Sequence, residues 1–200
     1  MVQTKKAEVR DAILKSARQL FNTRGYHGAS MAQIAADAGV SAANIYVYFG
    51  SKLEVLFAIY DPWLRARLLR LEDELQRVEP GQTQLRFILK TLWVDIPSEE
   101  NGFANNLMQA LSSVTPADPY SRELLSWTKR KITALIAGAL PSNRRFLVRD
   151  DGLAHILLMA FDGFALNQHL DGDAAKAEQT LDTMLKMLGG FQDDGGVSQQ

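Results

Sequence analysis

The sequence predicts an all-α protein with a small N-terminal part and a larger C-terminal part, and three observations support this prediction. Apolar residues recur at intervals of three and four residues along most of the chain. Residues that cap or end helices separate these apolar segments. Sustained alternation of polar and apolar residues, which is typical of strands, is absent from the sequence. We therefore expect helices throughout and no sheet.

The first two helices are closely spaced. One is expected over about residues 8–23, and it ends before Arg24-Gly25. A second starts at Ser30, which has the spacing of a capping box with Gln33. It ends at Gly39, because glycine readily adopts the left-handed backbone of helix ends. The apolar face of the first helix is Val9, Ile13, Ala17, Leu20 and Phe21.

A second tight corner follows directly. Ser41 is expected to cap a third helix, in which Ile45 and Phe49 form a buried i, i+4 pair. Ser51 with Glu54 forms a further capping box that opens a fourth helix. Two short helices joined by a turn that contains Gly form a helix-turn-helix, whose second helix enters the DNA major groove. The alternative is a helical corner that does not bind DNA.

The rest of the chain is also expected to be helical. The fourth helix keeps its apolar period to Leu75, and Asp61-Pro62 predicts a kink or a restart within it, because proline removes one hydrogen bond and clashes with the preceding turn. The next helix stops at Pro97. Further helices are expected over about 103–114, 118–140, 151–170 and 174–189, followed by a polar, Gly-rich tail that we expect to be disordered.

Composition excludes several classes of protein. The chain is 46% hydrophobic, so it can bury a core, and it has no cysteine for disulfides or thiolate chemistry. The N-terminus does not have the plan of a signal peptide, and the longest apolar run, near 156–161, is too short to span a bilayer. We expect a soluble, cytoplasmic protein without a membrane partner.

The net charge of −1 conceals an asymmetry between the two parts. Residues 1–53 carry seven basic and three acidic residues, and the remainder carries 15 basic and 20 acidic residues. A basic head on an acidic body is typical of a phosphate-binding module attached to a separate effector domain. A difference of this size also arises by chance, so it supports DNA binding without establishing it.

Two segments resemble the TetR family of transcriptional regulators. In residues 39–56, GVSAANIYVYFGSKLEVL, the family's order of residues is met by Ser41, Ile45-Tyr46, Tyr48-Phe49 and Ser51-Lys52. Residues 13–40 are similar to the family in their helix, their Arg-Gly-Tyr turn and their Ser-x-x-x-Ile-Ala segment. The resemblance implies a DNA-binding domain at 1–53, a helical ligand-binding and dimerisation domain at 54–191, and a tail at 192–200.

The resemblance also implies which residues contact DNA. Asn44 can pair with adenine, although its alternative role is a local cap, and Ala43 or Val47 can touch a thymine methyl group. At positions 42 and 44 the family often has Lys and Thr, and this chain departs from it at both. Ser30 and Lys52 are expected at phosphates, where they set register without sequence information. The expected DNA-binding residues are Ser30, Ala42, Ala43, Asn44, Tyr46, Val47, Tyr48 and Lys52.

A homodimer is expected, because palindromic operators are bound by two-fold symmetric dimers. The last two helices carry broad apolar faces and are the candidates for the interface. The alternative is that both faces belong to the core of one chain. The residues on the two faces are Leu153, Ile156, Leu157, Ala160, Phe161 and Phe164, and then Ala177, Leu181, Met184, Leu185 and Leu188.

A small-molecule effector is expected to bind an apolar cavity with a few polar groups inside the helical body. Ordinary core packing is the alternative for each residue. No cofactor or metal is expected. His155, Asp162 and His169 are seven residues apart, which on a helix is about 10.5 Å, too far for two of them to share one ion. The candidate ligand-binding residues are Trp63, Trp93, Phe103, Asn106, Trp127, Phe161, Phe164 and Asn167.

The resemblance implies a ligand-responsive, DNA-binding transcriptional regulator, most often a repressor, which a small, largely apolar ligand releases from a palindromic operator. One alternative is a DNA-binding regulator whose body binds a protein partner and has no small-molecule pocket. A helical enzyme is the other alternative. The sequence lacks a His-x-x-x-His pair, a Glu-x-x-His pair and a Gly-rich phosphate loop, so no catalytic constellation supports it.

Overall fold

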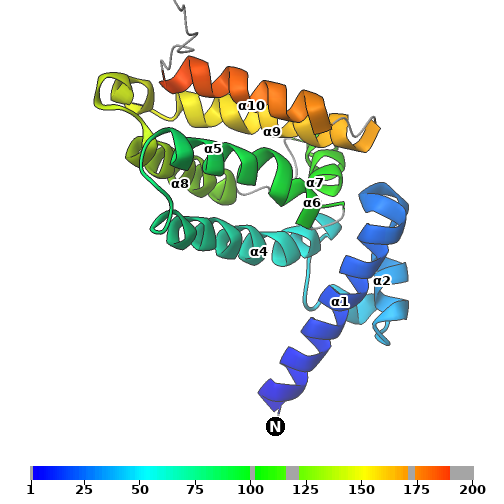
Figure 1. Cartoon of the computed structure of the whole chain (residues 1–200). Helices are drawn as coiled ribbons and strands as arrows, with labels where there is room; N and C mark the ends of the chain where they lie inside the picture. Colours follow the sequence, from blue (N-terminus) through cyan, green and yellow to red (C-terminus); the bar gives the residue numbers. More distant parts are fainter. Residues whose placement is uncertain (1, 100–101, 116–121, 171–173, 190–200) are drawn as a thin grey trace, which may run out of the picture. The chain divides into compact units, whose positions relative to one another are not determined.

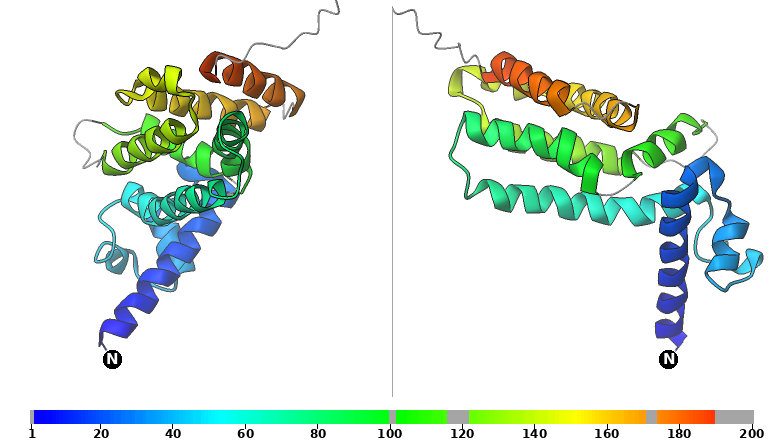
Figure 2. Two further views of the ribbon diagram at one scale, coloured as in Figure 1. Left: turned by 60° about the vertical axis from the view of Figure 1, so that its left-hand side comes forward. Right: turned by 45° about the vertical axis from the view of Figure 1, so that its right-hand side comes forward.

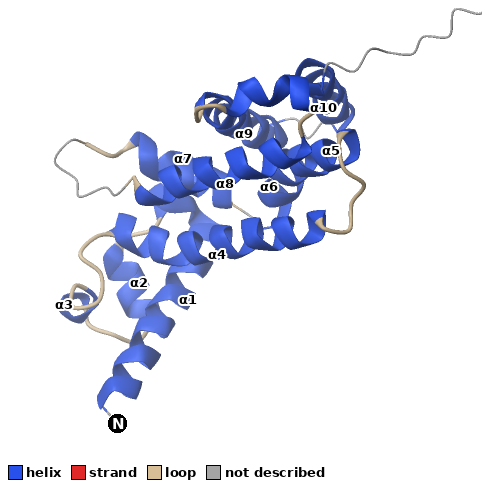
Figure 3. Ribbon diagram, turned by 90° about the vertical axis from the view of Figure 1, so that its left-hand side faces the viewer, coloured by secondary structure: helices blue, strands red, loops and turns tan. Residues whose placement is uncertain are grey.

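The computed structural model describes residues 2–99, 102–115, 122–170 and 174–189, and in these ranges all regular structure is helical, as predicted (Figures 1 and 3). The predicted tail from residue 192 lies outside the described residues, as do the side chains of Asn167 and His169. The α-helices are α1 (Val2–Gly28), α2 (Met31–Asp37), α3 (Ala42–Ile45), α4 (Lys52–Leu75), α5 (Gln82–Lys90), α6 (Ile96–Glu99), α7 (Phe103–Ser112), α8 (Glu123–Ala139), α9 (Gly152–Leu170) and α10 (Ala174–Gly189).

The chain forms two compact units. The first contains Met1–Leu68 and Pro97–Leu124, and the second contains Leu69–Ile96 and Leu125–Gln200. The chain therefore passes from one unit to the other inside α4, before Pro97, and inside α8. The first unit therefore contains the three helices of the predicted head, the first part of α4, most of α6, and α7. The division into functional domains at residues 53 and 54 stays a prediction.

Helix α1 is longer than predicted, because it begins at Val2, but its break falls where the sequence places it. Gly25 has φ 70° and ψ 171° inside the element, so the regular helix ends there. Ile13, Ala17 and Phe21 are buried on one face of α1, and α1 packs against both α2 and α7. The Ser16 hydroxyl adds a hydrogen bond of 3.1 Å to the carbonyl oxygen of Ile34 in α2.

The corner formed by α2 and α3 follows the predicted capping. The Ser30 side chain accepts the N–H of Gln33, and the Gln33 side chain accepts the N–H of Ser30, which completes the capping box. Gly39 has φ 70°, as expected for the end of α2. Helix α3 is shorter than predicted, since it ends at Ile45 and a turn follows. The run of β-branched and aromatic residues from Ile45 to Phe49 has low helix propensity and favours this tighter turn, which has i→i+3 hydrogen bonds.

Helix α4 is one continuous element, so of the two outcomes predicted at Asp61-Pro62 the restart is wrong, and the kink stays a prediction. Pro62 lies inside the helix, and Asp61 forms an ion pair with Arg65 one turn further on. Buried side chains on both sides of the proline, including Tyr60 and Leu64, hold the helix together across the missing hydrogen bond. Ser51 caps α4 by accepting the N–H of Glu54, whereas the Glu54 carboxylate accepts the N–H of Gly50, one residue earlier than in a capping box.

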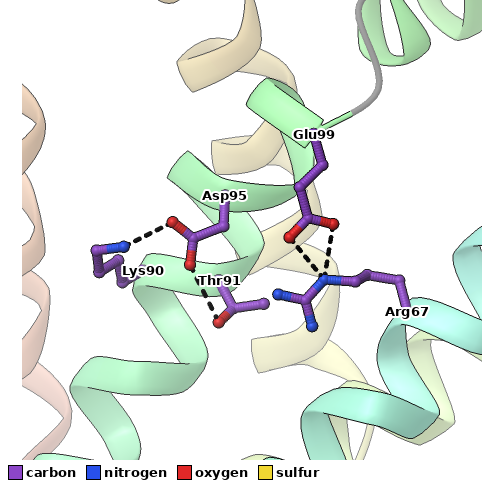
Figure 4. A network of polar contacts seen from close by, with 5 residues as sticks. All are labelled: Arg67, Lys90, Thr91, Asp95 and Glu99. Atoms are coloured by element: carbon purple, nitrogen blue, oxygen red, sulfur yellow. Dashed lines mark hydrogen bonds and ion pairs between the residues drawn. The ribbon is translucent and has the colours of Figure 1, made fainter.

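The helix predicted to stop at Pro97 continues through it. After α5 the backbone forms a π-helical segment, η1 (Thr91–Asp95), and then returns to α-helix in α6. The Asp95 carboxylate accepts hydrogen bonds from Lys90 and Thr91 inside the second unit (Figure 4). In the first unit, Arg67 on α4 is 7% exposed and its Nε lies 2.9 and 2.8 Å from the two carboxylate oxygens of Glu99.

The second unit is built around α5, η1, α8, α9 and α10. Helix α10 packs against α5, and the views in Figure 2 agree on this arrangement. Trp93 of η1 is fully buried, stacks on Phe164 with ring centroids 4.9 Å apart, and donates its indole N–H to the carbonyl oxygen of Leu157. A 3₁₀ segment, η2 (Ser142–Val148), precedes α9 and was not predicted. Among the described helices, none has the length and apolar character of a membrane span.

Candidate nucleic-acid interface

The first turn of α3 and the residues after it form an exposed surface on a firmly packed corner. Ile45 and Phe49 are buried, as predicted, and anchor this segment to the head. Tyr46 and Val47 are 57% and 66% exposed. Ala42, Ala43 and Asn44 are also exposed, and Tyr48 is half-buried. The structure thus brings the predicted base-contacting residues together on one surface.

The N-cap of α3 is Ser41 and not Asn44, whose alternative role was that of a local cap. The hydroxyl of Ser41 accepts the backbone N–H of Asn44 at 3.1 Å, so Ser41 is the cap. The Asn44 residue is exposed, and its side-chain amide is not needed for the cap. Ser30 is also exposed, but its hydroxyl takes part in the capping box of α2. Its contact to a phosphate stays a prediction.

Lys52 has a structural role that the sequence did not indicate. Its Nζ atom donates to the carbonyl oxygens of Tyr26 and Ala29 at 2.6 and 2.7 Å, and lies 4.2 Å from the centre of the Tyr26 ring. Partial burial lowers the pKa of the Lys52 ammonium through desolvation. Two of its three N–H donors are therefore used inside the head. Its predicted contact to a phosphate depends on the third donor and stays a prediction.

A basic groove adjoins the turn after α3. It has a volume of about 330 Å³ and is lined by Lys6, Ala7 and Arg10 of α1 and by Val47 and Tyr48. The Arg10 guanidinium lies over the Phe49 ring, 5.2 Å from its centroid. The sequence analysis counted Lys6 and Arg10 only in the net charge of the head. Their spacing of four residues on one helix was the signal that could have grouped them.

Two amide side chains of α7 hold the end of α1. Asn106 donates to the carbonyl oxygen of Phe21 at 3.2 Å and to the Tyr60 hydroxyl at 3.3 Å. The Gln109 Oε1 accepts the backbone N–H of His27 at 3.1 Å. We call Asn106 and Gln109 the α7 clasp. The clasp ties the head, residues 1–53, to α7 directly, so α4 is not its only link to the rest of the first unit.

The predicted ligand-binding residues fall into two groups, one in each unit. In the first unit, the Phe103 ring lies 4.9 Å from that of Trp63, and Asn106 belongs to the α7 clasp. In the second, Trp93 stacks on Phe164, while Phe161 is buried and Trp127 half-buried. Asn167 lies outside the described side chains. A cavity lined by these residues stays a prediction.

The described side chains contain no group of His, Asp and Glu that could hold a metal ion. His155 is exposed on α9, and desolvation raises the pKa of the Asp162 carboxyl on the same helix. The third member of the series, His169, has its side chain outside the described ones. Two hydroxyls of α8, on Thr128 and Thr133, are buried without a hydrogen-bond partner among the described residues.

The apolar faces of α9 and α10 divide between core and surface. Leu157 and Phe161 are buried, and so are Leu181, Leu185 and Leu188. These residues belong to the core of the second unit. A different set of large apolar side chains is exposed, and we call it the α9–α10 stripe. The stripe consists of Ile156, Met159, Leu166 and Met187.

Comparison with known proteins identifies relatives for the head and for the fold. Residues 13–59 match the family described as bacterial regulatory proteins, tetR family. The regulator RutR of Escherichia coli O157:H7 is 28% identical over 179 residues, which are 88% of this chain and 79% of RutR. The transcriptional activator FasR of Mycolicibacterium smegmatis is 30% identical over 96 residues, 48% of this chain. The chain spans only 44% of FasR in this match. These relatives are transcriptional regulators and not enzymes.

Solved structures share the fold along nearly the whole chain. The fatty acid degradation regulator FadR of Bacillus halodurans has a TM-score of 0.62 and 18% identity, covering 96% of this chain and 97% of that one. FadR of Bacillus subtilis, solved in complex with stearoyl-CoA, has a TM-score of 0.62 and 16% identity over 90% of this chain and 98% of that one. At these identities the likeness concerns the fold alone.

Proposed function

Because this chain belongs to the TetR family of bacterial regulatory proteins, we propose that it is a cytoplasmic transcriptional regulator that binds a palindromic DNA operator as a homodimer. The observation that carries the proposal is the exposed surface of α3 and the turn after it. Its small and polar side chains project from a corner that Ile45 and Phe49 anchor in the core. Such a surface fits the major groove.

The proposed contacts follow from the chemistry of each side chain. Asn44 pairs with an adenine edge, Ala43 and Val47 contact thymine methyl groups, and Ala42 lies close to the base edges. Tyr46, Tyr48, Ser30 and Lys52 contact phosphates and set the register of the protein on the duplex. These residues belong to the proposed DNA-binding domain at 1–53.

We propose that the α9–α10 stripe is covered by a second copy of the chain. Ile156, Met159 and Leu166 lie at intervals of three and seven residues, so they share one face of α9. An exposed row of large apolar side chains is costly in water and is typical of an interface. A dimer places two heads on two half-sites of a palindrome.

We propose that a small, largely apolar effector releases the protein from its operator, so that the protein is a repressor. The effector acts by population shift, and its effect is limited by its differential affinity for the two states of the dimer. The family resemblance supports a small-molecule effector, and a structural relative, FadR of Bacillus subtilis, was solved with stearoyl-CoA, whose acyl chain is apolar. The proposed effector and dimerisation domain is residues 54–191.

The test is selection of duplexes from a randomised library by the full chain, followed by titration of the enriched duplexes in fluorescence anisotropy. We expect palindromes whose half-site centres are about 10 base pairs, or a multiple of that, apart. Asn44→Ala should change the preferred bases, and Gln76→Ala, on an exposed turn of the second unit, should not. Failure to enrich any sequence, with no binding to mixed-sequence duplex, contradicts the proposal. Stearoyl-CoA and shorter acyl-CoA molecules are the first effectors to titrate against the bound complex.

A further inference from the structure

The basic groove beside the turn after α3 has features that the proposed base contacts do not use. Lys6 and Arg10 are one helical turn apart on α1 and face the groove together. Ala7 is the third α1 residue that lines the groove, and its side chain is only a methyl group. The opposite wall is formed by Val47 and Tyr48, which belong to the exposed surface of the candidate interface. The groove is thus continuous with that surface.

The charged groups of the groove are available for a ligand. Lys6 and Arg10 are exposed, and the described residues provide no ion-pair partner for either. The Arg10 guanidinium is oriented by the Phe49 ring below it, at 5.2 Å. Stacking occupies the face of a guanidinium and leaves its N–H edges directed outward. The phenol of Tyr48 is a further potential donor.

We propose that this groove binds the sugar–phosphate backbone of one DNA strand, with Lys6 and Arg10 as phosphate contacts. The inference rests on the proposed DNA-binding function and extends its contact surface from the helix-turn-helix to α1. A backbone strand fits because the groove is open, is lined by two cations, and adjoins the residues that lie against base edges. Arg10 pairs with phosphate oxygens through two N–H groups, and Lys6 acts as a point charge.

The contacts set position and affinity without sequence preference. Phosphate contacts fix the register of a protein on the duplex, and base contacts specify the site. Arg10 also touches Phe49, which anchors the turn that carries Val47. A phosphate held by Arg10 therefore places the turn at a defined depth in the adjacent major groove.

The test uses the full chain and a fluorescein-labelled, mixed-sequence duplex of about 30 base pairs, long enough for two half-sites one helical turn apart. The variants are Lys6→Gln, Ala7→Glu and Ala7→Gln. Ala7→Glu adds a negative charge to the lining of the groove, and Ala7→Gln is its uncharged control of similar size. Arg77→Gln, an exposed cation of the second unit, is the control for general charge. Circular dichroism melting confirms that each variant is folded.

The logarithm of the association constant for DNA falls as the logarithm of the salt concentration rises. We expect Lys6→Gln to reduce the magnitude of this slope by about one for each protomer. Ala7→Glu should weaken binding at least tenfold more than Ala7→Gln, and Arg77→Gln should leave both quantities unchanged. The duplexes selected from a randomised library should be the same for Lys6→Gln and wild type. If wild type binds DNA but Lys6→Gln and Ala7→Glu keep its slope and affinity, the phosphate contacts are wrong and the proposed function stands. If wild type binds no duplex, both fail.

Discussion

Lys52 joins the end of one helix of the head to the beginning of another through a single ammonium group. Its two hydrogen bonds are made to carbonyl oxygens of Tyr26 and Ala29, which follow the break in α1. Carbonyl groups at the end of a helix have no partner within the helix, and a cation there satisfies them and interacts favourably with the helix dipole. A residue expected at the DNA surface thus also stabilises the head itself.

Replacing Lys52 should therefore change both stability and DNA binding. Lys52→Gln leaves one or both carbonyls without a partner, which costs about 1 kcal/mol or more of the free energy of unfolding. Loss of the proposed phosphate contact should weaken binding to all duplexes equally. It should also reduce the magnitude of the salt slope by about one per protomer. Urea unfolding and anisotropy titrations at several salt concentrations measure the two effects. A normal salt slope with reduced stability would leave Lys52 only its role inside the head.

Gly25 and Gly39 both have positive φ, yet their replacement should cost different amounts. At Gly39 φ is 70°, as is common at a helix end, and a Cβ would meet nothing within 4 Å. Gly25 combines φ 70° with ψ 171°, a region restricted to glycine, and a Cβ there would lie 3.2 Å from Gln109 Oε1. We expect Gly39→Ala to cost about 1–2 kcal/mol and Gly25→Ala to cost more, because it also displaces the α7 clasp. Equal losses in urea unfolding would contradict this explanation.

At the scale of elements, helix α4 shows how tertiary packing overrides a local breaker. It carries Pro62 in its interior and still extends without interruption from Lys52 to Leu75. The helix belongs to both compact units, since the division lies between Leu68 and Leu69. We therefore propose that the geometry of α4 affects the coupling between operator binding and effector binding.

Pro62→Ala tests this role. The substitution restores one backbone hydrogen bond and removes the clash with the preceding turn, so we expect a higher free energy of unfolding, by about 1 kcal/mol or more. A stiffer α4 should alter operator affinity or the response to effector while leaving dimerisation unchanged. Anisotropy titration and sedimentation are the measurements, with Gln76→Ala as the control. Operator binding and effector response equal to those of wild type would reduce Pro62 to a structural accommodation.

At the scale of the whole molecule, the proposed function requires two copies of the head, one for each half-site of the operator. The proposed dimer depends on the α9–α10 stripe, because its four side chains are exposed, whereas Leu157, Phe161, Leu181, Leu185 and Leu188 of the same helices are in the core. Leu181 is 0% exposed, whereas Met159 is 53% exposed. A charge at each position therefore has a different consequence.

Met159→Lys should give a folded monomer, because the charge blocks the proposed interface without entering the core. Leu181→Lys should unfold the second unit, because an unpaired charge cannot be buried there. Sedimentation at micromolar concentration reports the oligomeric state, and circular dichroism reports folding. Gln76→Lys, on the exposed turn after α4, is the matched control and should remain dimeric. A wild-type chain that sediments as a monomer, or a dimer that survives Met159→Lys, would contradict this interface.

The sequence by itself determined the features that depend on neighbouring residues. The all-α fold, the capping box at Ser30, the turns at Gly25 and Gly39, and the approximate bounds of α9 and α10 all follow from contacts within four residues. The family resemblance carried the interpretation of residues 39–56 further than spacing alone. Local interactions suffice for these features, because capping and turn chemistry act over a single helical turn.

Tertiary structure decided what local pattern left open. The partners of Lys52 lie more than twenty residues away, the groove joins α1 to the turn after α3, and the α7 clasp joins α7 to α1. Tertiary packing also stabilises α4 as a continuous helix through Pro62. It determines which apolar residues of α9 and α10 are buried. The period of a helix identifies an apolar face, but it does not say which neighbour covers that face. Which face is covered, and by which helix, depends on contacts between segments far apart in the sequence. The free energy of these contacts exceeds the differences in helix propensity between residues.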